Sequence, residues 1–299
     1  MHFGKVSLIG VGLLGGSLGM ALRRRRLADE VWGLVRREAS LAECLEQGAA
    51  DFTTLNPEHA VRDADLVVLC TPVGQMSGLL ERCLPSLAPG ALVTDVGSVK
   101  ARLVACLEEP TRRAGGVFVG SHPMAGSEHT GVVHGRADLF EGAVCVVTPT
   151  DDTPAEAVEQ VEALWQAVGG RPLRLAPAAH DELVSRASHL PHLVAGALVQ
   201  EVLRADLPPE QALLCATGFR DTTRVASGSV EMWRDIALQN ATCLDRVLGD
   251  FAERLARLRT AIRDGDGSAI RDFLGRSKEL RDAWQQQAPG RTRFPEGGG

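Results

Sequence analysis

The chain has 299 residues, enough for two domains of ordinary size, and its 44% hydrophobic and 23% charged residues are typical of a globular protein with a substantial core. The formal net charge of −6 argues against a nucleic-acid partner, and no apolar run approaches the ~18 residues of a membrane span. The seven cysteines include no Cys-x-x-Cys pair, which argues against a zinc site and a disulfide framework, and the absence of tyrosine excludes a tyrosine acid or base. With no signal-peptide pattern before the first strand, we expect a cytoplasmic protein with reduced thiols.

The first elements predict a dinucleotide-binding loop. The apolar run from residue 5 to residue 9 predicts a strand, and a helix follows from about residue 18. Between them, Gly10 would make the tight turn, Gly12 would let the backbone approach a pyrophosphate, and Gly15 would allow the helix to pack closely on the strand. The free N–H groups of the helix N-terminus would then face the phosphates. The residues of this loop expected to contact the cofactor are Gly10, Gly12, Leu13, Leu14 and Gly15.

The end of the second strand bears on which dinucleotide is bound. This strand is predicted over residues 30–35, and a NAD-binding domain normally carries an acidic residue at its end for the ribose 2′-hydroxyl. Val35 occupies that place and Arg36 and Arg37 follow it, so we expect the two arginines to bind a 2′-phosphate and the cofactor to be NADP. Glu38 is close enough in the chain to leave NAD open as the alternative.

Two further strands, predicted over residues 64–70 and 91–95, also end in small or polar residues. Thr71 and Pro72 follow the first strand, and Ser98 follows the second. Ligands of an open α/β sheet bind beyond the carboxyl ends of its strands, so we expect Thr71 and Pro72 at the cofactor and Ser98 at the substrate. Ser98 can also serve as the N-cap of a helix predicted to end near residue 107, and the two roles are compatible.

The stretch Ser121-His122-Pro123-Met124-Ala125-Gly126 supplies the candidate catalytic residue. An apolar run over residues 116–119 predicts a buried strand, and Pro123 predicts a turn directly after it. His122 would therefore lie at the carboxyl end of the strand; the alternative is a histidine that only caps the strand end. The glycine-rich segment 131–142 that follows is long enough to close over a ligand.

The order of elements predicts an α/β fold class with two domains. The alternation of strands and helices predicts an N-terminal Rossmann-type dinucleotide-binding domain over residues 1–176. From Ala179 the pattern is helical only, which predicts an all-helical C-terminal domain for substrate binding and dimerisation over residues 177–287. The Gly- and Pro-rich residues 288–299 are expected to be a disordered tail.

The helical part carries two further polar stretches and a long apolar seam. Pro191 interrupts a helical run and predicts a break or kink beside His189 and His192. Residues 217–226 are predicted to be a loop with two arginines and an aspartate, and residues 232–262 a single long helix. Apolar residues of that helix recur at spacings of four and three, which favours a helix–helix or subunit interface. They are Leu244, Leu248, Phe251, Leu255, Leu258 and Ile262.

Six stretches, in this order and spacing, resemble the prephenate dehydrogenase family, whose members oxidise prephenate or arogenate. The resemblance covers about residues 4 to 285. It implies oxidative decarboxylation of prephenate to 4-hydroxyphenylpyruvate with NAD or NADP, and a dimer formed by the helical domain. The stretches are Gly10 to Ser17, Asp95 to Lys100, His122 to Gly126, Ser188 to His192, Gly218 to Arg224 and Met232 to Asp235.

The resemblance also implies roles for individual residues. His122 matches the histidine that accepts the hydrogen bond of the 4-hydroxyl during oxidation, and Ser98 matches a serine that orients the same region. Arg224 matches the arginine for the ring carboxylate, and His192 matches a second substrate-binding histidine. Two acidic residues of an ionic network near Arg224 are matched by Glu128 and Asp221. No metal is expected, because the motifs supply no ligand set.

Three alternatives remain open from the sequence. Arogenate, or both cyclohexadienyl substrates, can replace prephenate. A β-hydroxyacid or 6-phosphogluconate type of dehydrogenase would need a lysine from the helical domain, where Lys278 is the only lysine beyond Lys100. A non-catalytic dinucleotide-sensing protein would leave His122, His192 and Arg224 unexplained.

Overall fold

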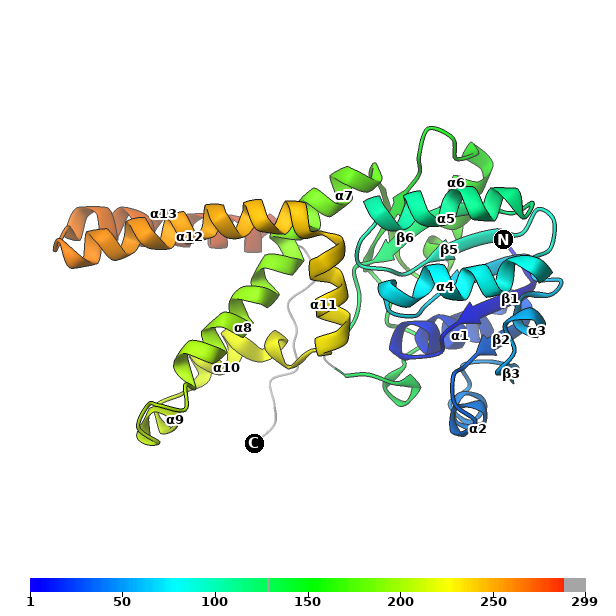
Figure 1. The fold of residues 1–299 in the computed structure, drawn as a ribbon, viewed down its shortest axis with the longest axis horizontal. Coiled ribbons are helices and arrows are strands. Elements are labelled where there is room, and N and C mark those ends of the chain that lie inside the picture. Colours follow the sequence, from blue (N-terminus) through cyan, green and yellow to red (C-terminus); the bar gives the residue numbers. More distant parts are fainter. Residues whose placement is uncertain (128, 288–299) are drawn as a thin grey trace. The chain divides into compact units, whose positions relative to one another are not determined.

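The computed structural model describes residues 1–127 and 129–287 and divides the chain into two compact units, Met1–Leu244 and Asp245–Gly299 (Figure 1). Glu128 and the expected disordered tail, residues 288–299, lie outside the described residues. Within the described part, no helix is both long and apolar enough to cross a membrane.

The first unit is built on an eight-stranded sheet with the strand order β3-β2-β1-β4-β5-β6-β7-β8. Neighbours from β3 to β6 pair in parallel, β6 and β7 pair antiparallel, and β7 and β8 pair in parallel. The short strand β3 was not expected from the sequence. The strands are β1 (Phe3–Ile9), β2 (Ala28–Leu34), β3 (Phe52–Thr54), β4 (Leu66–Leu69), β5 (Leu92–Asp95), β6 (Val117–Pro123), β7 (Val144–Thr148) and β8 (Arg171–Arg174).

Helices cover both faces of this sheet and create two apolar cores. On one face Leu18 of α1 and Trp165 of α6 pack against Leu8 and its neighbours, all fully buried. On the other face α4 and α5 lie side by side (Figure 1), and Met76 packs there against Ile9. The helices are α1 (Leu13–Arg25), α2 (Ala39–Glu46), α3 (Pro57–Val61), α4 (Val73–Cys83), α5 (Ala101–Arg113) and α6 (Ala155–Ala167).

Strand β6 differs from the expectation in a way that affects the site. The strand does not turn at Pro123 but continues through His122 to Pro123, paired antiparallel with β7. The N–H of Ser121 points to Asp95 at the end of β5, and the N–H of Met124 points to Val144 of β7. By the alternation of a strand, the N–H that Pro123 lacks would have pointed to the side where β5 has already ended. The proline therefore costs the sheet no hydrogen bond.

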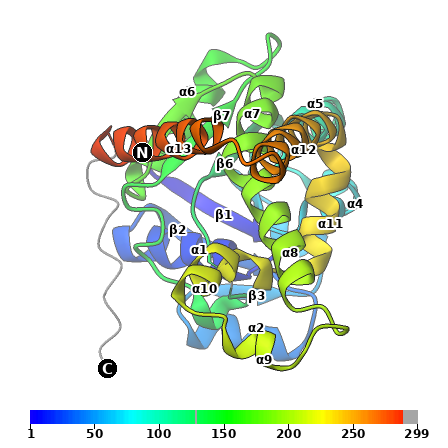
Figure 2. The same cartoon turned by 90° about the vertical axis from the view of Figure 1, so that its left-hand side faces the viewer.

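The chain after the sheet is helical, as predicted, and α8 and α10 lie beside each other (Figure 2). The expected irregularity at Pro191 is a π-helical turn, η3, which joins α7 to α8. The predicted loop 217–226 is instead the helix α10 followed by the 3₁₀ turn η4. The elements are α7 (Pro177–Val184), η3 (Ser185–His189), α8 (Leu190–Val202), α9 (Glu210–Leu213), α10 (Thr217–Thr223) and η4 (Arg224–Ser227).

The helix predicted over residues 232–262 is two helices, α11 (Val230–Gln239) and α12 (Ala241–Arg263). They are separated by Asn240, whose buried side-chain amide donates to the backbone oxygen of Asp181 over 2.9 Å. This hydrogen bond to another element holds Asn240 outside the helical conformation. The spacing of apolar residues along the sequence does not reveal such a break.

The second unit comprises most of α12 and the helix α13 (Gly267–Gln287). Several of its large apolar side chains are exposed, among them Leu255 at 48%, Ile262 at 60% and Trp284 at 59%. A pair of helices with this many exposed apolar side chains is typical of an element that packs against another chain.

Candidate active site

The strand order brings the predicted site residues that follow β1, β4 and β5, together with His122 of β6, to one edge of the sheet. β1, β4, β5 and β6 are consecutive neighbours and run parallel. Gly10 directly follows β1, and Thr71 and Ser98 follow shortly after β4 and β5. His122 is the last residue but one of β6. The glycine loop and the histidine therefore lie at the same carboxyl edge, where open α/β sheets bind ligands.

The glycine loop has the shape that a dinucleotide requires. Gly10 has a φ of +96°, and a Cβ there would lie 2.5 Å from Thr71 Cγ2. A Cβ on Gly15 would lie 2.2 Å from the carbonyl oxygen of Gly10, whereas a Cβ on Gly12 would meet no atom within 4 Å. Gly12 precedes α1, so the open space faces a helix N-terminus. The buried Thr71 hydroxyl has no hydrogen-bond partner among the described residues, which leaves it available to a ligand.

Leu13 and Leu14 form the first turn of α1, and Pro72 is the N-cap of α4, so all three lie at the N-termini of helices beside the loop. At the end of β2, Val35 is buried while Arg36 and Arg37 are exposed. The loop thus has the features of a nicotinamide dinucleotide site.

His122 is buried and begins a chain of hydrogen bonds that links three side chains, its own on β6 and two on α7. Its Nδ1 is 2.8 Å from Nε2 of His180, and Nδ1 of His180 is 2.8 Å from Oδ1 of Asp181. The three side chains are 7%, 0% and 3% exposed, so the chain is shielded from solvent. Sequence reasoning found His122 but neither of its partners.

Asp181 also caps the helix that follows β5. Its Oδ1 accepts the backbone N–H of Lys100 over 2.7 Å, and its Oδ2 accepts that of Ala101 over 2.8 Å. Helix α5 begins at Ala101 with Lys100 as N-cap residue, so the alternative of Ser98 as the N-cap is wrong. The cap comes from 80 residues further along the chain, and no hydrogen bond of the Ser98 hydroxyl is found within the described residues.

A buried ion pair lies under this part of the sheet edge. The Lys100 ammonium bonds to the carboxylate of Asp95 and donates to the backbone oxygen of Ser121 over 2.8 Å. Asp95 in turn accepts the backbone N–H groups of Ser121 and Gly97. Burial lowers the pKa of Lys100, and Asp95 opposes that shift. The pair ties the end of β5 to the strand that carries His122.

The histidines of the site are held in the neutral form. Burial lowers the pKa of His122 well below 6.5, and His180, Lys100 and His189 lower it further. Burial also lowers the pKa of His180, although Asp181 favours its charged form. At neutral pH the site therefore offers unprotonated imidazole nitrogens, as a general base requires.

The second predicted histidine, His192, lies face to face on Trp233, with ring centroids 3.4 Å apart and an interplanar angle of 17°. Gly228, which ends η4, lies against the same two rings. Burial lowers the pKa of His192 to about 4. His189 packs edge-on against Trp233, and its Nδ1 is 3.2 Å from the Asn240 amide. These contacts connect His192 to the segment that carries Arg224.

Two further predicted residues, Arg224 and Asp221, are exposed. Arg224 is an exposed residue of η4, the turn that packs against α8. Asp221 lies in α10 with its carboxylate 77% exposed and 3.8 Å from Arg220. Glu128, the other predicted acidic residue, lies outside the described residues.

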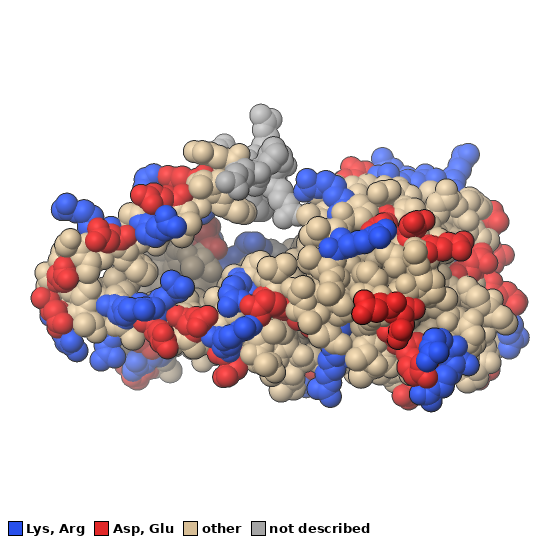
Figure 3. Space-filling view, turned by 90° about the horizontal axis from the view of Figure 1, so that it is seen from above, with Lys and Arg blue, Asp and Glu red and all other residues tan. Residues whose placement is uncertain are grey.

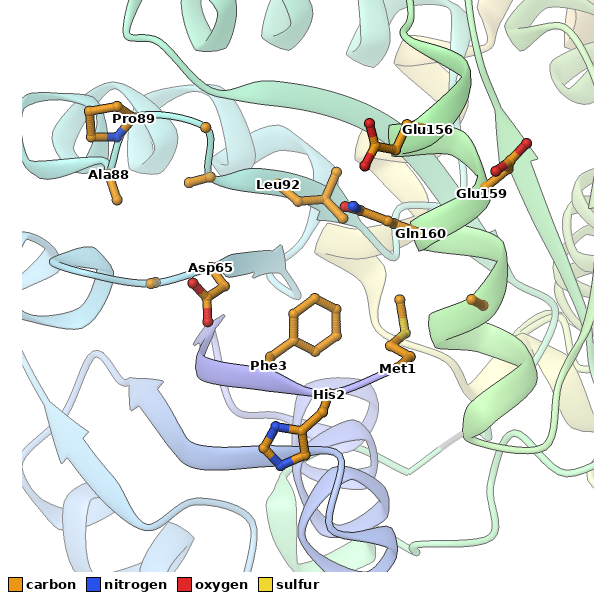
Figure 4. A pocket seen from close by; sticks show the side chains of 14 residues that line it. Met1, His2, Phe3, Asp65, Ala88, Pro89, Leu92, Glu156, Glu159 and Gln160 are labelled. Carbon is orange, nitrogen blue, oxygen red and sulfur yellow. The ribbon is translucent and has the colours of Figure 1, made fainter.

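A cavity among the described residues lies apart from the carboxyl edge of the sheet. This cavity has a volume of about 690 Å³ and is lined by Phe3, Asp65 and Glu156, among others (Figure 4). Phe3 begins β1 and Asp65 directly precedes β4, so the cavity lies at the amino edge of the sheet, opposite His122. The face seen in Figure 3 shows acidic and basic side chains interspersed, without a large patch of either sign.

Two family models match successive parts of the chain. Residues 18–173 match the family model "Prephenate dehydrogenase, nucleotide-binding domain", and residues 176–276 match "Prephenate dehydrogenase, dimerization domain". The prephenate dehydrogenase of Bacillus subtilis is 34% identical over 284 residues, which are 93% of this chain and 75% of the relative. The cyclohexadienyl dehydrogenase of Zymomonas mobilis is also 34% identical over 284 residues, 93% of this chain and 95% of the relative.

Among solved structures, the chain is similar to prephenate dehydrogenase from A. aeolicus in complex with hydroxyphenyl propionate and NAD⁺. The TM-score is 0.87 at 32% identity, and the match covers 95% of this chain and 99% of the other.

The loop geometry predicts different effects for two glycine substitutions. Gly12→Ala places a methyl group in open space, so the protein should keep its melting temperature but bind NAD or NADP at least about tenfold more weakly, because the methyl group keeps the pyrophosphate away from the backbone. Isothermal titration with each dinucleotide measures the affinity. Gly78→Ala is the matched control, since a Cβ there also meets nothing within 4 Å. Equal affinities for Gly12→Ala and wild type would reject the assignment.

Proposed function

The chain belongs to the prephenate dehydrogenase family, and on that premise we propose how its residues carry out oxidative decarboxylation of prephenate to 4-hydroxyphenylpyruvate, a step of tyrosine biosynthesis. The observation that carries the proposal is the position of His122. It is a buried, neutral histidine at the carboxyl edge of the sheet. Its strand, β6, is separated from β4 by β5, and β4 is the direct neighbour of β1, which carries the glycine loop.

His122 acts as the general base toward the 4-hydroxyl of the substrate. Its Nδ1 is occupied by His180, so Nε2 is the ring nitrogen left for the hydroxyl. As the ring carbon is oxidised, the hydroxyl proton moves to that nitrogen and a carbonyl forms. Ser98, on the adjacent strand end, orients the hydroxyl by a hydrogen bond. Such proton transfer contributes about 10²–10⁴-fold to rate.

Arg224 and His192 bind the rest of the substrate. Arg224 presents a guanidinium fork, which suits the ring carboxylate because two parallel N–H donors match its two oxygens. His192 is kept neutral and is fixed by the Trp233 ring, so it can bind the side chain of the substrate by hydrogen bonds without adding charge. Glu128 and Asp221 complete the proposed ionic network near Arg224.

The glycine loop binds the nicotinamide dinucleotide through Gly10, Gly12, Gly15 and the first turn of α1, with Thr71 and Pro72 beside it. When bound, this group supplies the hydride acceptor. The exposed Arg36 and Arg37 support a preference for NADP through contacts with a 2′-phosphate. The A. aeolicus relative, described in complex with NAD⁺, supports the alternative.

Prephenate rather than arogenate is the proposed substrate. The two differ in a side chain that ends in a keto acid or an amino acid, and the ammonium of arogenate favours an anionic partner. The contacts found for His192 within the described residues are with Trp233 and beside Gly228, neither of which is anionic. The similarity to a cyclohexadienyl dehydrogenase keeps arogenate as the second candidate, and an assay of both substrates with both dinucleotides distinguishes them.

The chain is proposed to consist of two domains and to form a homodimer. Residues 1–176 form the dinucleotide domain and residues 177–287 the helical domain, which is supported by the ranges of the two family models. The chain forms a homodimer through the helical domain. The exposed apolar side chains of α12 and α13, such as Leu255 and Ile262, support this interface.

Replacing the base should remove turnover without removing cofactor binding. We expect His122→Asn to reduce kcat for prephenate on the order of 10²-fold or more at unchanged dinucleotide affinity. In the wild type a base works only when unprotonated, and the pKa of His122 is lowered, so kcat/KM should fall only as the pH drops well below 6.5. Near-normal turnover of His122→Asn at neutral pH would sink the assignment.

Removing the carboxylate partner should act mainly on binding. For Arg224→Ala we expect a KM for prephenate raised at least about tenfold, because a charge-assisted bidentate pair is lost. Steady-state kinetics at saturating dinucleotide measure the change. The matched control is Arg220→Ala, an exposed arginine on the preceding helical turn, which should leave KM near the wild-type value. If both variants behave alike, Arg224 does not bind the substrate.

The double variant Arg36→Ala with Arg37→Ala tests the choice of dinucleotide. Loss of the two guanidinium groups should raise the KM for NADP at least about tenfold more than the KM for NAD, since only NADP carries the 2′-phosphate. Initial rates with each dinucleotide at fixed prephenate give both values. Equal changes for the two dinucleotides would remove the arginines from the 2′-phosphate site.

A further inference from the structure

We propose that His180 and Asp181 are positioning residues for His122, which hold its imidazole in the tautomer with the proton on Nδ1 and an unprotonated Nε2. The proposal rests on the proposed function of His122 as the base and names what makes that nitrogen available. Neither partner lies in the polar motifs from which the site was predicted.

The direction of each hydrogen bond follows from the carboxylate end of the chain. Asp181 accepts two backbone N–H groups at the start of α5, so its oxygens act as acceptors. The Nδ1 of His180, 2.8 Å from Oδ1, must therefore carry the proton and donate. In a neutral imidazole the other nitrogen is then an acceptor. His180 Nε2 accordingly accepts from Nδ1–H of His122, which leaves His122 Nε2 without a proton.

The surroundings of His122 favour this neutral arrangement. Lys100, which precedes α5, His180 of α7 and His189 of η3 all disfavour a second proton on its ring. Asp181 and Asp95 are the nearby anions, and Asp95 is already bonded to Lys100. Because all these groups are buried, the hydrogen bonds between them, and not bonds to bulk water, decide which ring nitrogen of His122 carries the proton.

The same chain stabilises the product of proton transfer. When the hydroxyl proton moves to His122 Nε2, the ring becomes a buried imidazolium. Its Nδ1–H bond to His180 then strengthens, and His180 remains bonded to the Asp181 carboxylate. One proton has moved from substrate oxygen to nitrogen, and the positive charge is separated from a carboxylate by a single imidazole.

Nitrogen NMR of the full-length protein tests the tautomer without any turnover. The chain has eight histidines, so ¹⁵N-histidine labelling gives a small set of ring signals, and the His122→Asn variant identifies those of His122. We expect a protonated Nδ1 and an unprotonated Nε2 for His122 in the wild type near neutral pH. The opposite tautomer would overturn the proposal, whatever the activity.

Asp181→Asn reverses the chain while keeping the side-chain shape. With its NH₂ at the Oδ1 position the new amide would donate to His180 Nδ1, and its oxygen would keep the N–H of Ala101, while the N–H of Lys100 would lose its acceptor. His180 would then donate to His122 and leave the proton of His122 on Nε2. We expect the swapped ¹⁵N pattern and a kcat for prephenate lower on the order of 10²-fold or more, with KM and dinucleotide affinity near wild type.

A control and a second variant separate positioning from support of the fold. Asn240→Ala removes a hydrogen bond to the backbone oxygen of Asp181 and a contact with His189 but leaves the carboxylate contacts of Asp181, so it should lower the melting temperature and keep the ring proton of His122 on Nδ1. His180→Ala leaves the hydrogen bonds of Asp181 to the start of α5 in place. Added imidazole should raise the kcat of this variant at least about tenfold. A folded His180→Ala variant with wild-type kcat, or one that imidazole does not rescue, overturns the proposal. Absence of prephenate turnover in the wild type would instead reject the proposed function.

Discussion

The carboxylate of Asp181 is the interaction on which the site depends. It belongs to α7, yet it caps α5 of the sheet region and bonds to His180, which contacts His122. A buried carboxylate is costly unless its oxygens are satisfied, and here backbone N–H groups and an imidazole satisfy them. Helix α7 therefore cannot move away from the sheet without leaving both an uncapped helix and an unpaired buried charge. The geometry of His122 is set by the same bonds.

The sheet edge is prepared for this contact by a second buried charge pair. Lys100 and Asp95 are both fully buried, and between them they bind the backbone at Ser121 and Gly97. A buried ion pair is weak evidence for stability but fixes geometry, because loss of either partner leaves an uncompensated charge. The pair holds the end of β5 against β6 at the point where the two strands part. Ser98 and His122 are thereby kept on neighbouring strand ends.

The parts of the site that could be predicted from the sequence are those whose residues lie close together in the chain. The glycine loop needs its three glycines at fixed spacing, and His122 stands in a motif, so both were found from short stretches. Asp181 was missed because its function is to cap a helix that begins 80 residues earlier, and nothing adjacent in the chain signals this. The break at Asn240 was missed for the same reason, since its amide bonds to Asp181 rather than to its own helix. The adjacent pair His180-Asp181 at the start of the helical region was the one signal available.

The continuation of β6 through His122 and Pro123 has a similar explanation and a functional consequence. A proline predicts the end of a strand, but the N–H that Pro123 lacks would face the side of β6 on which β5 has already ended. Because the strand continues, β7 holds the backbone of His122 rigidly on one side while His180 holds its ring on the other. Burial makes the ring a neutral base at ordinary pH, and the same burial makes its protonated form costly. A base in such a place needs an anion within reach of its far nitrogen, and Asp181, acting through His180, supplies one without contacting the base itself.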